Sequence, residues 1–460
     1  MIVKRIPFSW IAEEEHRLDC GPFTRGGIEA KKRLEASSLQ KEDLIDLTTG
    51  GATGMYHVGM DKLRWVDGRD YGVPFLRSSD ILKADLSSQP LISREQAEAN
   101  PLFRCPAGST LITRSGSIGR MAYCRQDMAD MAMSQDVLKV VPDSSRVPPG
   151  YLYAFLSSRF GVPLVVSGTF GSIIVHIEAE NIARLPVPRL GPQVEEQVHA
   201  LVQGAAAARS KAVGLLEKAR QRVRGMLPVH AGPSPSLWTS VHSSRLQPRL
   251  DAFYFSAPCI AARRAFDGAA VAEHRKLGDV ARVFIPGIFK RRYADPEYGI
   301  PYLTGNDVFQ LAPTSDRYLM RSVAEQFDLV VSQGDILIQE AGQIGGLIGR
   351  SVLVGSYLDG FAISNNMIRL TPHEASDSGY ISAVLSTSEG VLLISRESAG
   401  SSIPHIDESR VRNIRIPWPP AAERRTIGDD VIRAQELRDQ ACVDESRARM
   451  LVEDAIEAAS

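Results

Sequence analysis

An internal duplication constrains this chain more than any other feature of its sequence. Short motifs of the first half return in the same order about 230 residues later, and their spacing drifts by only a few residues. The matched segments are Arg17-Leu-Asp19 with Arg249-Leu-Asp251, Tyr71-Gly-Val-Pro-Phe-Leu76 with Tyr298-Gly-Ile-Pro-Tyr-Leu303, Gly108-Ser-Thr-Leu-Ile112 with Gly334-Asp-Ile-Leu-Ile338, Gly116-Ser-Ile-Gly119 with Gly342-Gln-Ile-Gly345, Gly150-Tyr151 with Gly379-Tyr380, His176-Ile177 with His405-Ile406, and Arg184-Leu-Pro-Val-Pro188 with Arg415-Ile-Pro-Trp-Pro419. One such match arises by chance, but an ordered series does not. The halves are therefore predicted to be two copies of one folding unit.

Each unit is predicted to be mixed α/β. The runs Thr110–Thr113 and Ile336–Ile338 indicate strands. The segments that begin at Gly150 and Gly379 indicate short helices with an apolar face. The Gly-x-Ile-Gly segments indicate tight turns. Glycine there serves either a close approach of the backbone to another group or only a hairpin or bulge.

A long helical pattern follows the Pro-x-Pro end of each unit. The predicted boundaries are 1–190 for the first α/β domain, 191–227 for the first helix, 228–248 for a linker rich in Pro, Ser and His, 249–419 for the second domain and 420–460 for the second helix.

Both helical patterns carry apolar residues at alternating three- and four-residue spacing, which is typical of a coiled-coil seam. The first predicted seam is Val198, Leu201, Ala205, Ala208, Ala212, Leu215, Ala219 and Met226, interrupted at Arg222. The second is Ile427, Ala434, Leu437, Ala441, Ala448, Leu451 and Ala455, interrupted at Asp430 and Asp444. We expect the two helices to form an antiparallel coiled coil. The alternative is that each helix packs only on its own domain.

Composition narrows the class of protein. The chain has 460 residues, 44% of them hydrophobic and 23% charged, which is typical of globular domains. No apolar run approaches the roughly 20 residues that cross a bilayer, and the N-terminus lacks a signal-peptide pattern, so a cytoplasmic protein without a membrane partner is expected. The five cysteines are scattered and include no C-x-x-C pair, so neither a zinc site nor a disulfide framework is predicted.

The sequence contains no recognisable catalytic motif. The segment Asp295-Pro-Glu297 lacks the second proline of a base-methyltransferase loop, and the glycines at 345–349 lack the spacing and the lysine of a phosphate-binding loop. The acids after His176 and His405 have no lysine or further acid beside them, as a nuclease would need, and the histidines show no metal-ligand spacing. We therefore expect no active site, no metal and no cofactor in this chain.

The ordered duplication resembles the specificity subunits of type I restriction-modification systems. The Arg-Leu-Asp start, the Tyr-Gly-[Val/Ile]-Pro motif, the Gly-rich block, and the Pro-x-Pro end with a following Glu (Glu195, Glu423) carry the resemblance along nearly the whole chain. The resemblance implies two target-recognition domains that each read half of a split site in double-stranded DNA. It also implies paired helices that act as a spacer and dock methyltransferase subunits, which bind S-adenosylmethionine. A separate motor-nuclease subunit is a possible further partner.

Candidate DNA contacts lie where the copies differ, since two half-sites need different side chains. They are Lys62, Arg64, Trp65 and Arg69 in the first unit, Lys290, Arg291 and Arg292 in the second, and the turn residues Arg114, Ser115 and Gln343. Candidate partner contacts are Arg209, Lys211, Glu217 and Arg220, which are expected to be exposed beside the first seam. The formal net charge of −1 is unusual for a DNA-binding protein. Two alternatives therefore stay open: a protein-interaction scaffold that reads no DNA, and a self-sufficient DNA-binding nuclease.

Overall fold

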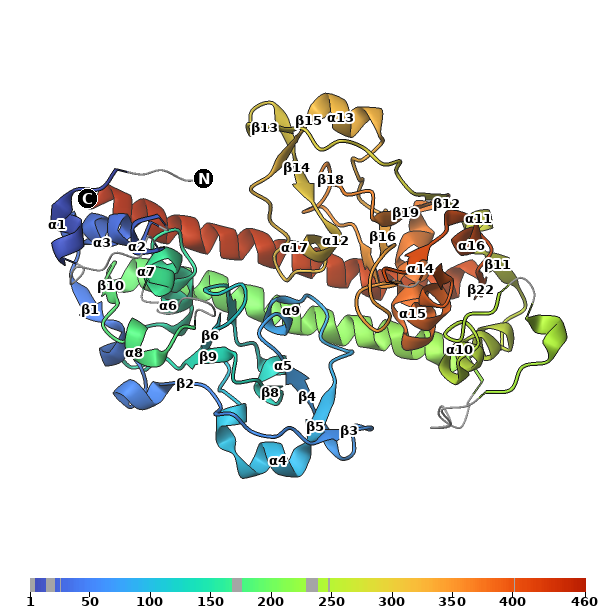
Figure 1. The fold of residues 1–460 in the computed structure, drawn as a ribbon, viewed down its shortest axis with the longest axis horizontal. Coiled ribbons are helices and arrows are strands. Elements are labelled where there is room, and N and C mark those ends of the chain that lie inside the picture. The colour runs from blue at the N-terminus through green and yellow to red at the C-terminus, as the bar shows by residue number, and fades with distance from the viewer. Residues whose placement is uncertain are drawn as a thin grey trace. The chain divides into compact units, whose positions relative to one another are not determined.

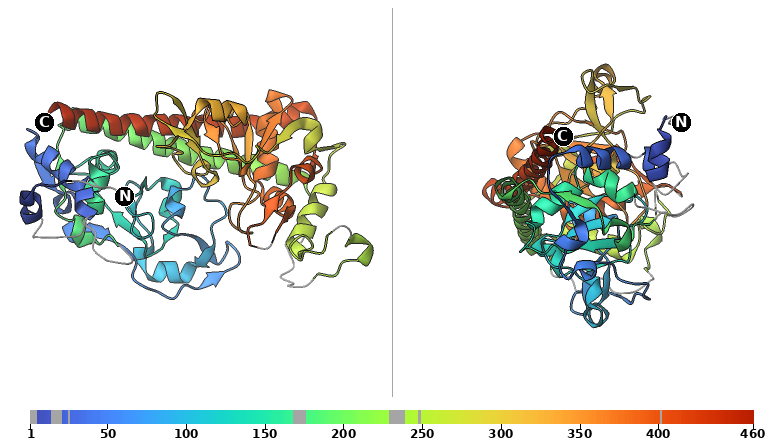
Figure 2. Two further views of the ribbon diagram at one scale, coloured as in Figure 1. Left: turned by 45° about the horizontal axis from the view of Figure 1, so that its top comes forward. Right: turned by 90° about the vertical axis from the view of Figure 1, so that its left-hand side faces the viewer.

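The computed structural model describes residues 5–13, 21–24, 26–167, 176–228, 239–246, 249–400 and 402–460. The predicted motif Arg17-Leu-Asp19 and most of the predicted linker 228–248 lie outside these residues. The chain divides into two units: unit 1 contains Met1–Ser210 and Gln440–Ser460, and unit 2 contains Lys211–Asp439. Figures 1 and 2 show the helices and strands of both units.

Unit 1 contains two four-stranded sheets. The first has the strand order β2-β9-β6-β7, with β2 (Met55–Tyr56), β9 (Val137–Val140), β6 (Thr110–Thr113) and β7 (Met121–Tyr123). The second has the order β3-β5-β4-β8, with β3 (Trp65–Val66), β5 (Leu91–Ser93), β4 (Gly72–Leu76) and β8 (Ala132–Met133). A two-stranded sheet pairs β1 (Lys41–Asp43) with β10 (Pro186–Pro188). The helices before α9 are α1 (Phe8–Glu13), α2 (Gly21–Thr24), α3 (Gly27–Ala36), α4 (Arg94–Ala99), α5 (Gln126–Ala129), α6 (Pro149–Leu156), α7 (Gly161–Ser167) and α8 (Ala179–Ile182).

Unit 2 repeats these three sheets in the same strand order. Its four-stranded sheets are β12-β19-β16-β17, with β12 (Ala281–Phe284), β19 (Met367–Pro372), β16 (Ile336–Gln339) and β17 (Ser351–Leu353), and β13-β15-β14-β18, with β13 (Tyr293–Ala294), β15 (Tyr318–Met320), β14 (Gly299–Leu303) and β18 (Ala362–Ile363). The strand β11 (His274–Lys276) pairs with β22 (Arg415–Pro417), and β20 (Ser398–Ala399) with β21 (His405–Ile406). The helices before α17 are α10 (Ala257–Asp267), α11 (Leu277–Val280), α12 (Gly305–Val308), α13 (Arg321–Gln326), α14 (Ser378–Ser386), α15 (Ser388–Ser395) and α16 (Glu408–Arg412).

The registers of the strands agree between the copies, which confirms the predicted duplication. Gly72 pairs with Ser93 as Gly299 pairs with Met320, and β4 and β14 each pair in parallel with a short last strand, β8 and β18. The buried tyrosines that follow Gly150 and Gly379 donate from their hydroxyls to the carbonyls of Pro188 and Pro417. The two motifs therefore hold equivalent helices, α6 and α14, against equivalent strands.

The Gly-x-Ile-Gly turns differ more than their sequences suggest. The sequence pairs Gly119 with Gly345, but the structure places Gly349 at the position of Gly119. The Gly119 amide donates to the Thr113 carbonyl at the base of the β6–β7 hairpin, and the Gly349 amide donates to the Gln339 carbonyl at the base of the β16–β17 hairpin. Both glycines have a positive φ. The second hairpin is therefore four residues longer, and the pairing of Gly119 with Gly345 predicted from the sequence is wrong.

The long helices are α9 (Pro192–Met226) and α17 (Ala421–Ala458), and each contributes to both units. In Figure 1 and in the left view of Figure 2, α9 (green) lies beside α17 (red). In unit 1 the Arg209 guanidinium contacts the Glu445 carboxylate. In unit 2 the Arg222 guanidinium donates 2.9 Å to the Thr426 carbonyl and lies 3.3 Å from the Asp430 carboxylate. Residue numbers fall on one helix as they rise on the other, so the predicted antiparallel coiled coil is confirmed.

The predicted seam is correct at every second position and wrong by one residue at the others. The buried heptad series on α9 is Val198, Val202, Ala205, Arg209, Ala212, Leu216, Ala219, Val223 and Met226. The predicted residues Leu201, Ala208 and Leu215 are only partly buried. The same shift occurs on α17, where Val431, Glu445 and Val452 are buried beside Ile427, Ala434, Ala441 and Ala448. Two features explain the difference. Each helix also packs on a globular unit, which widens its apolar face, and the seam contains charged residues, which hydrophobic periodicity does not assign to a buried face.

Substitution of a glycine tests how closely a long helix approaches a domain. A methyl group added at Gly379 in α14 would lie 2.3 Å from the Gly428 carbonyl oxygen of α17, within the distance that real Cβ atoms avoid. We expect Gly379→Ala to lower the free energy of unfolding by about 1–3 kcal/mol through overpacking. Gly214→Ala is the control, since nothing lies within 4 Å of its added methyl group. It should stabilise α9 by up to about 1 kcal/mol. Thermal melts of both variants measure the effects, and a stable Gly379→Ala protein would contradict this packing.

Candidate nucleic-acid interface

The two predicted basic-aromatic clusters occupy equivalent positions on the two units. In unit 1, Trp65 of the edge strand β3 pairs with Ile92 of β5. In unit 2, Tyr293 of the edge strand β13 pairs with Leu319 of β15, the position equivalent to Ile92. The preceding residues match as well, because the carbonyls of Arg64 and Arg292 accept from the next residue of β5 and β15 at 2.8 and 2.9 Å. Lys62, Arg64 and Trp65 therefore correspond to Lys290, Arg292 and Tyr293.

An aromatic pair supports each of these edges. The Trp65 ring meets Phe75 of β4 edge-on, with ring centroids 5.5 Å apart. The Tyr293 ring lies 6.3 Å from Tyr302, the residue of β14 that is equivalent to Phe75. Phe75 and Tyr302 are buried, whereas Trp65 and Tyr293 are 55% and 49% exposed. Each edge strand thus presents a half-exposed aromatic side chain that a buried ring holds in place. Such a side chain suits stacking or apolar contact with a nucleic acid.

The cations beside these rings are available for an external ligand. Lys62, Arg64, Lys290 and Arg292 are exposed, and their side chains make no hydrogen bond or ion pair with any residue that the structure describes. Arg291 is also exposed, and its Nε donates 3.1 Å to the Tyr302 hydroxyl. Arg69 donates 3.0 Å to the Ser87 carbonyl. Both edges therefore present exposed cations that have no internal partner among the described residues.

The local charge of the two edges differs. Residues 59–71 hold three basic and three acidic side chains, whereas residues 287–298 hold three basic and two acidic ones. The second edge is therefore the more positive of the two. Both edges also end in an exposed tyrosine of the Tyr-Gly-[Val/Ile]-Pro motif, with Tyr71 75% and Tyr298 70% exposed. The motif marked these tyrosines in the sequence, but their contribution to the same surface becomes visible only in the fold.

The turn residue Arg114 is held inside unit 1. Its guanidinium contacts the Glu178 carboxylate, and its Nε donates 3.1 Å to the Ile177 carbonyl. Burial raises the pKa of Glu178, but the hydrogen bond and charge of Arg114, with His57 at 3.3 Å, lower it below its usual value overall. In unit 2, the equivalent residue Glu340 instead accepts 2.8 Å from His405. Contact of Arg114 with DNA stays a prediction and would require the Glu178 pair to open or be shared.

The remaining turn residues lie nearer to solvent. Ser115 is partly buried and its carbonyl accepts 3.4 Å from Ser78, whereas Gln343 is exposed in the longer hairpin of unit 2. Ile344, next to Gln343, is 44% exposed. The two hairpins thus present different chemistry at comparable places, as two different half-sites would need. Direct contact of Ser115 and Gln343 with DNA also stays a prediction.

The predicted exposure of the partner-contact residues on α9 is wrong for Arg209 and Arg220. Arg209 is 3% exposed and Arg220 6% exposed. Arg209 belongs to the helix seam of unit 1, and the Arg220 Nε donates 3.3 Å to the Ser386 hydroxyl of α14. Lys211 is exposed and Glu217 is partly exposed. Hydrophobic periodicity predicted that these arginines are exposed, because it assigns no charged residue to the buried face of a helix.

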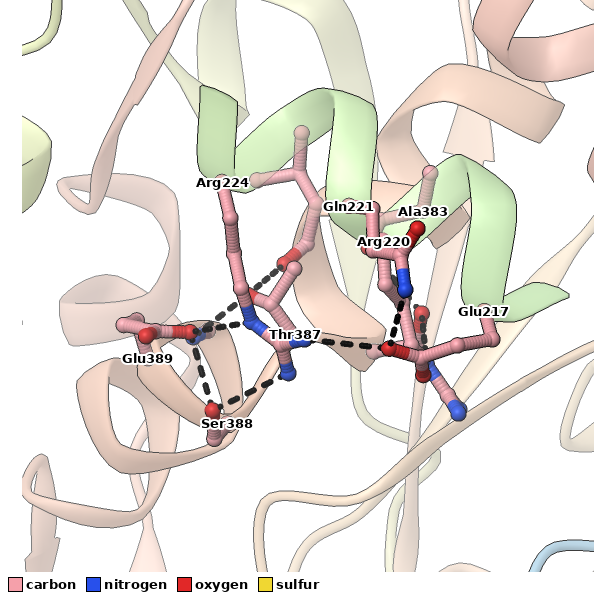
Figure 3. Close-up of polar contacts among 11 residues, drawn as sticks. Glu217, Arg220, Gln221, Arg224, Ala383, Thr387, Ser388 and Glu389 are labelled. Carbon is pink, nitrogen blue, oxygen red and sulfur yellow. Dashed lines mark hydrogen bonds and ion pairs between the residues drawn. The ribbon is translucent and has the colours of Figure 1, made fainter. Parts of the chain in front are cut away.

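Figure 3 shows what the second half of α9 contacts in unit 2. Arg224 lies between Glu217, at 3.4 Å, and the start of α15, where it approaches Glu389 at 3.4 Å and donates 3.2 Å to the Ser388 hydroxyl. This face of α9 therefore holds α14 and α15 in place. A charge reversal at Arg220 would disturb the fold of unit 2, so it cannot serve as a clean test of partner docking.

Comparison with known protein families identifies the second unit. Residues 272–432 match the family model described as the type I restriction modification DNA specificity domain. The match covers the sheets and most of the helices of unit 2, including the cluster Lys290-Arg291-Arg292. The predicted resemblance is confirmed there, and unit 1 repeats the strand order and registers of this specificity domain.

Solved structures of the same kind also align with the chain at low identity. A type I restriction-modification S subunit from M. genitalium is 12% identical, with a TM-score of 0.37 and coverage of 92% of this chain and 96% of the other. An HsdS subunit from Thermoanaerobacter tengcongensis is 12% identical, with a TM-score of 0.29 and coverage of 92% and 97%. A chain from a study of complex assembly and conformational transition of the type I system is 15% identical, with a TM-score of 0.30 and coverage of 92% and 98%. No curated protein matches the chain. The family model matches residues 272–432 alone.

The structure also bears on metals and membranes. Among the residues that it describes, no three His, Cys, Asp or Glu side chains are placed to hold a metal ion. None of the described helices combines the length and apolar character needed to cross a bilayer.

Proposed function

We propose that this chain reads a bipartite site in double-stranded DNA, with one half-site for each specificity domain. The observation that carries the proposal is the equivalence of the two edge strands, where exposed cations without internal partners flank a half-exposed aromatic ring. Cations in such positions pair with phosphates, and arginine can also bind guanine through two hydrogen bonds. The near-neutral net charge is compatible with this role because a locally basic edge does not require a basic chain, and residues 287–298 hold three basic and two acidic side chains.

We further propose that catalysis resides in partner subunits. A methyltransferase subunit would bind S-adenosylmethionine, and a motor-nuclease subunit would cut DNA, as the family resemblance implies. Within this proposal Lys211 and Glu217 remain as partner contacts on α9, because Arg209 and Arg220 are buried. Co-purification of a methyltransferase with the wild-type chain, and its loss in Lys211→Glu, would support docking on this helix.

Binding of the assembled complex to a library of randomised DNA duplexes tests the proposal against its alternatives. We expect enrichment of one split sequence, with two constant parts separated by an unspecified spacer. A complex that assembles but enriches no sequence would favour the scaffold without DNA reading. Metal-dependent cleavage by the isolated chain would favour the self-sufficient nuclease.

The constant heptad spacing of the observed seam supports a spacer role for the helices. Both helices pass from one unit into the other near Ser210 and Asp439, so these are the places for an insertion. Inserting one heptad into each helix should lengthen the connection by ~10 Å, or about three base pairs of DNA. The preferred spacer in the enriched sequence should grow by that amount. A single heptad inserted into α9 alone is the control, because it breaks the register and should prevent assembly. An unchanged spacer in the double insertion would contradict the spacer role.

A further inference from the structure

Two cysteines that are 19 residues apart in the sequence lie in contact inside unit 1. The sulfur atoms of Cys105 and Cys124 are 3.4 Å apart. Cys105 is 4% exposed and Cys124 is fully buried. Cys105 precedes β6, and Cys124 directly follows β7, where its backbone amide donates 2.8 Å to the Ser109 carbonyl. The β6–β7 hairpin therefore holds the two thiols side by side.

The duplication supplies an internal comparison for this pair. The strand registers place Val331 at the position of Cys105 and Val354 at the position of Cys124. Both valines are buried in the core of unit 2. The fold therefore needs only two small apolar side chains here, so packing alone does not account for two sulfur atoms in contact.

A buried cation completes the cluster. Lys139 of β9 is fully buried, its Nζ donates 2.9 Å to the Leu102 carbonyl, and it lies 5.3 Å from the centroid of the Tyr56 ring. The equivalent cation of unit 2, Arg369, pairs with the Asp328 carboxylate at 2.8 Å. No carboxylate among the described residues pairs with Lys139. The cation therefore lacks the counter-charge that its copy has.

The thiols take the place of that carboxylate in the electrostatics of the cluster. The hydrogen bond with Cys124 lowers the pKa of the Cys105 thiol, burial opposes this shift, and the charge of Lys139 lowers the pKa further. The pKa of Cys124 is raised well above its usual value by the hydrogen bond with Cys105 and by burial. Burial lowers the pKa of Lys139 to about 8, so at neutral pH it still carries its proton. One thiol is thus favoured as thiolate and its neighbour is kept protonated, which is the asymmetry of a nucleophilic and a resolving cysteine.

We propose that Cys105 and Cys124 form a redox modification site that closes to an intrachain disulfide when it meets a peroxide. The Cys105 thiol releases its proton, the thiolate attacks one peroxide oxygen, and the O–O bond breaks. The products are Cys105 sulfenic acid and a hydroxide, which takes up the released proton to form water. The Cys124 sulfur then attacks the sulfenic sulfur, the S–O bond breaks, and the proton of Cys124 neutralises the departing hydroxide charge. Two thiols and one hydrogen peroxide therefore give one disulfide and two waters. The bond would join the segment before β6 to the end of β7.

Peptide mapping of the full-length chain tests the site. The reduced protein is treated with hydrogen peroxide, alkylated in denaturant and digested, and the peptides are analysed by mass spectrometry. We expect a linked pair of peptides that contain Cys105 and Cys124, lighter by two hydrogens than their sum, and separated again by dithiothreitol. Cys259 and Cys442, which are also buried, should be recovered alkylated.

Variants that carry the valines of unit 2 at the equivalent positions serve as matched controls. The double variant Cys105→Val with Cys124→Val should fold and form no linked peptide. Lys139→Arg retains the charge and should oxidise like the wild type, whereas Lys139→Met should oxidise more slowly, by up to roughly tenfold for each unit by which the thiol pKa rises. Recovery of both alkylated thiols after peroxide treatment, or of Cys105 sulfinic acid without any linked peptide, would overturn the proposal.

Discussion

Replacing Arg209 alone with leucine should destabilise unit 1 by about 3–5 kcal/mol, because it leaves the Glu445 carboxylate buried without its partner. The two side chains are 4% and 2% exposed and sit in the seam between α9 and α17. Burial disfavours the charge of Arg209, but Glu445 raises the pKa of Arg209 above its usual value, so Arg209 keeps its charge. Urea denaturation followed by circular dichroism measures the loss. Faster hydrogen exchange at the amides of residues 198–209 would show that the loss of stability affects the first half of α9.

The double variant Arg209→Leu with Glu445→Leu is the matched control. The helix registers place Leu216 on α9 at the position that Glu445 has on α17, so leucine is already accepted at one copy of this site. Removing both charges should recover most of the lost stability, since an apolar pair of similar volume carries no desolvation cost. If the double variant is as unstable as either single variant, the effect arises from other contacts, such as Arg449, which lies 3.8 Å from Glu445.

Replacing Arg291 and Arg292 with alanine should change recognition of one half-site only. If either arginine binds guanine through two hydrogen bonds, its loss should cost about 1–3 kcal/mol and relax the preference at one base position. If the two arginines contact only phosphates, affinity should fall for all sequences, and the dependence of binding on salt should weaken by about one unit of slope per contact. Binding of the assembled complex to a randomised-site library at two salt concentrations separates these results.

The equivalent change in unit 1 provides the reciprocal control. Arg64 occupies the position of Arg292, is exposed and has no internal partner among the described residues. Arg64→Ala should therefore affect the other half-site and leave the first unchanged. Wild-type affinity and base preference in both half-sites after the Arg291 and Arg292 change would remove the β13 edge from the reading surface. Loss of preference in both half-sites from either variant would contradict modular reading.

The sequence by itself determined the duplication, the element types and the positions of the long helices. The ordered motif pairs are enough to define two copies, because each motif fixes a local structure: a turn at Gly119, a helix start at Gly150, a strand end at Pro188. The helical patterns predicted α9 and α17 to within two residues, since Pro-x-Pro ends and sustained apolar periodicity are local signals. Lys290-Arg291-Arg292 was also visible as a cluster, because its members are adjacent in the chain.

Tertiary structure alone decided the features that depend on partners far away in the sequence. The observed seam includes Arg209 and Glu445, which pair across 236 positions, and periodicity cannot foresee a buried charge that has a distant partner. Arg220 is buried because α14 packs against it. The two basic-aromatic clusters proved equivalent through strand register, which a loop sequence does not encode. Cys105 and Cys124 came into contact because a hairpin closed between them, and only the fold gives two scattered cysteines a common environment.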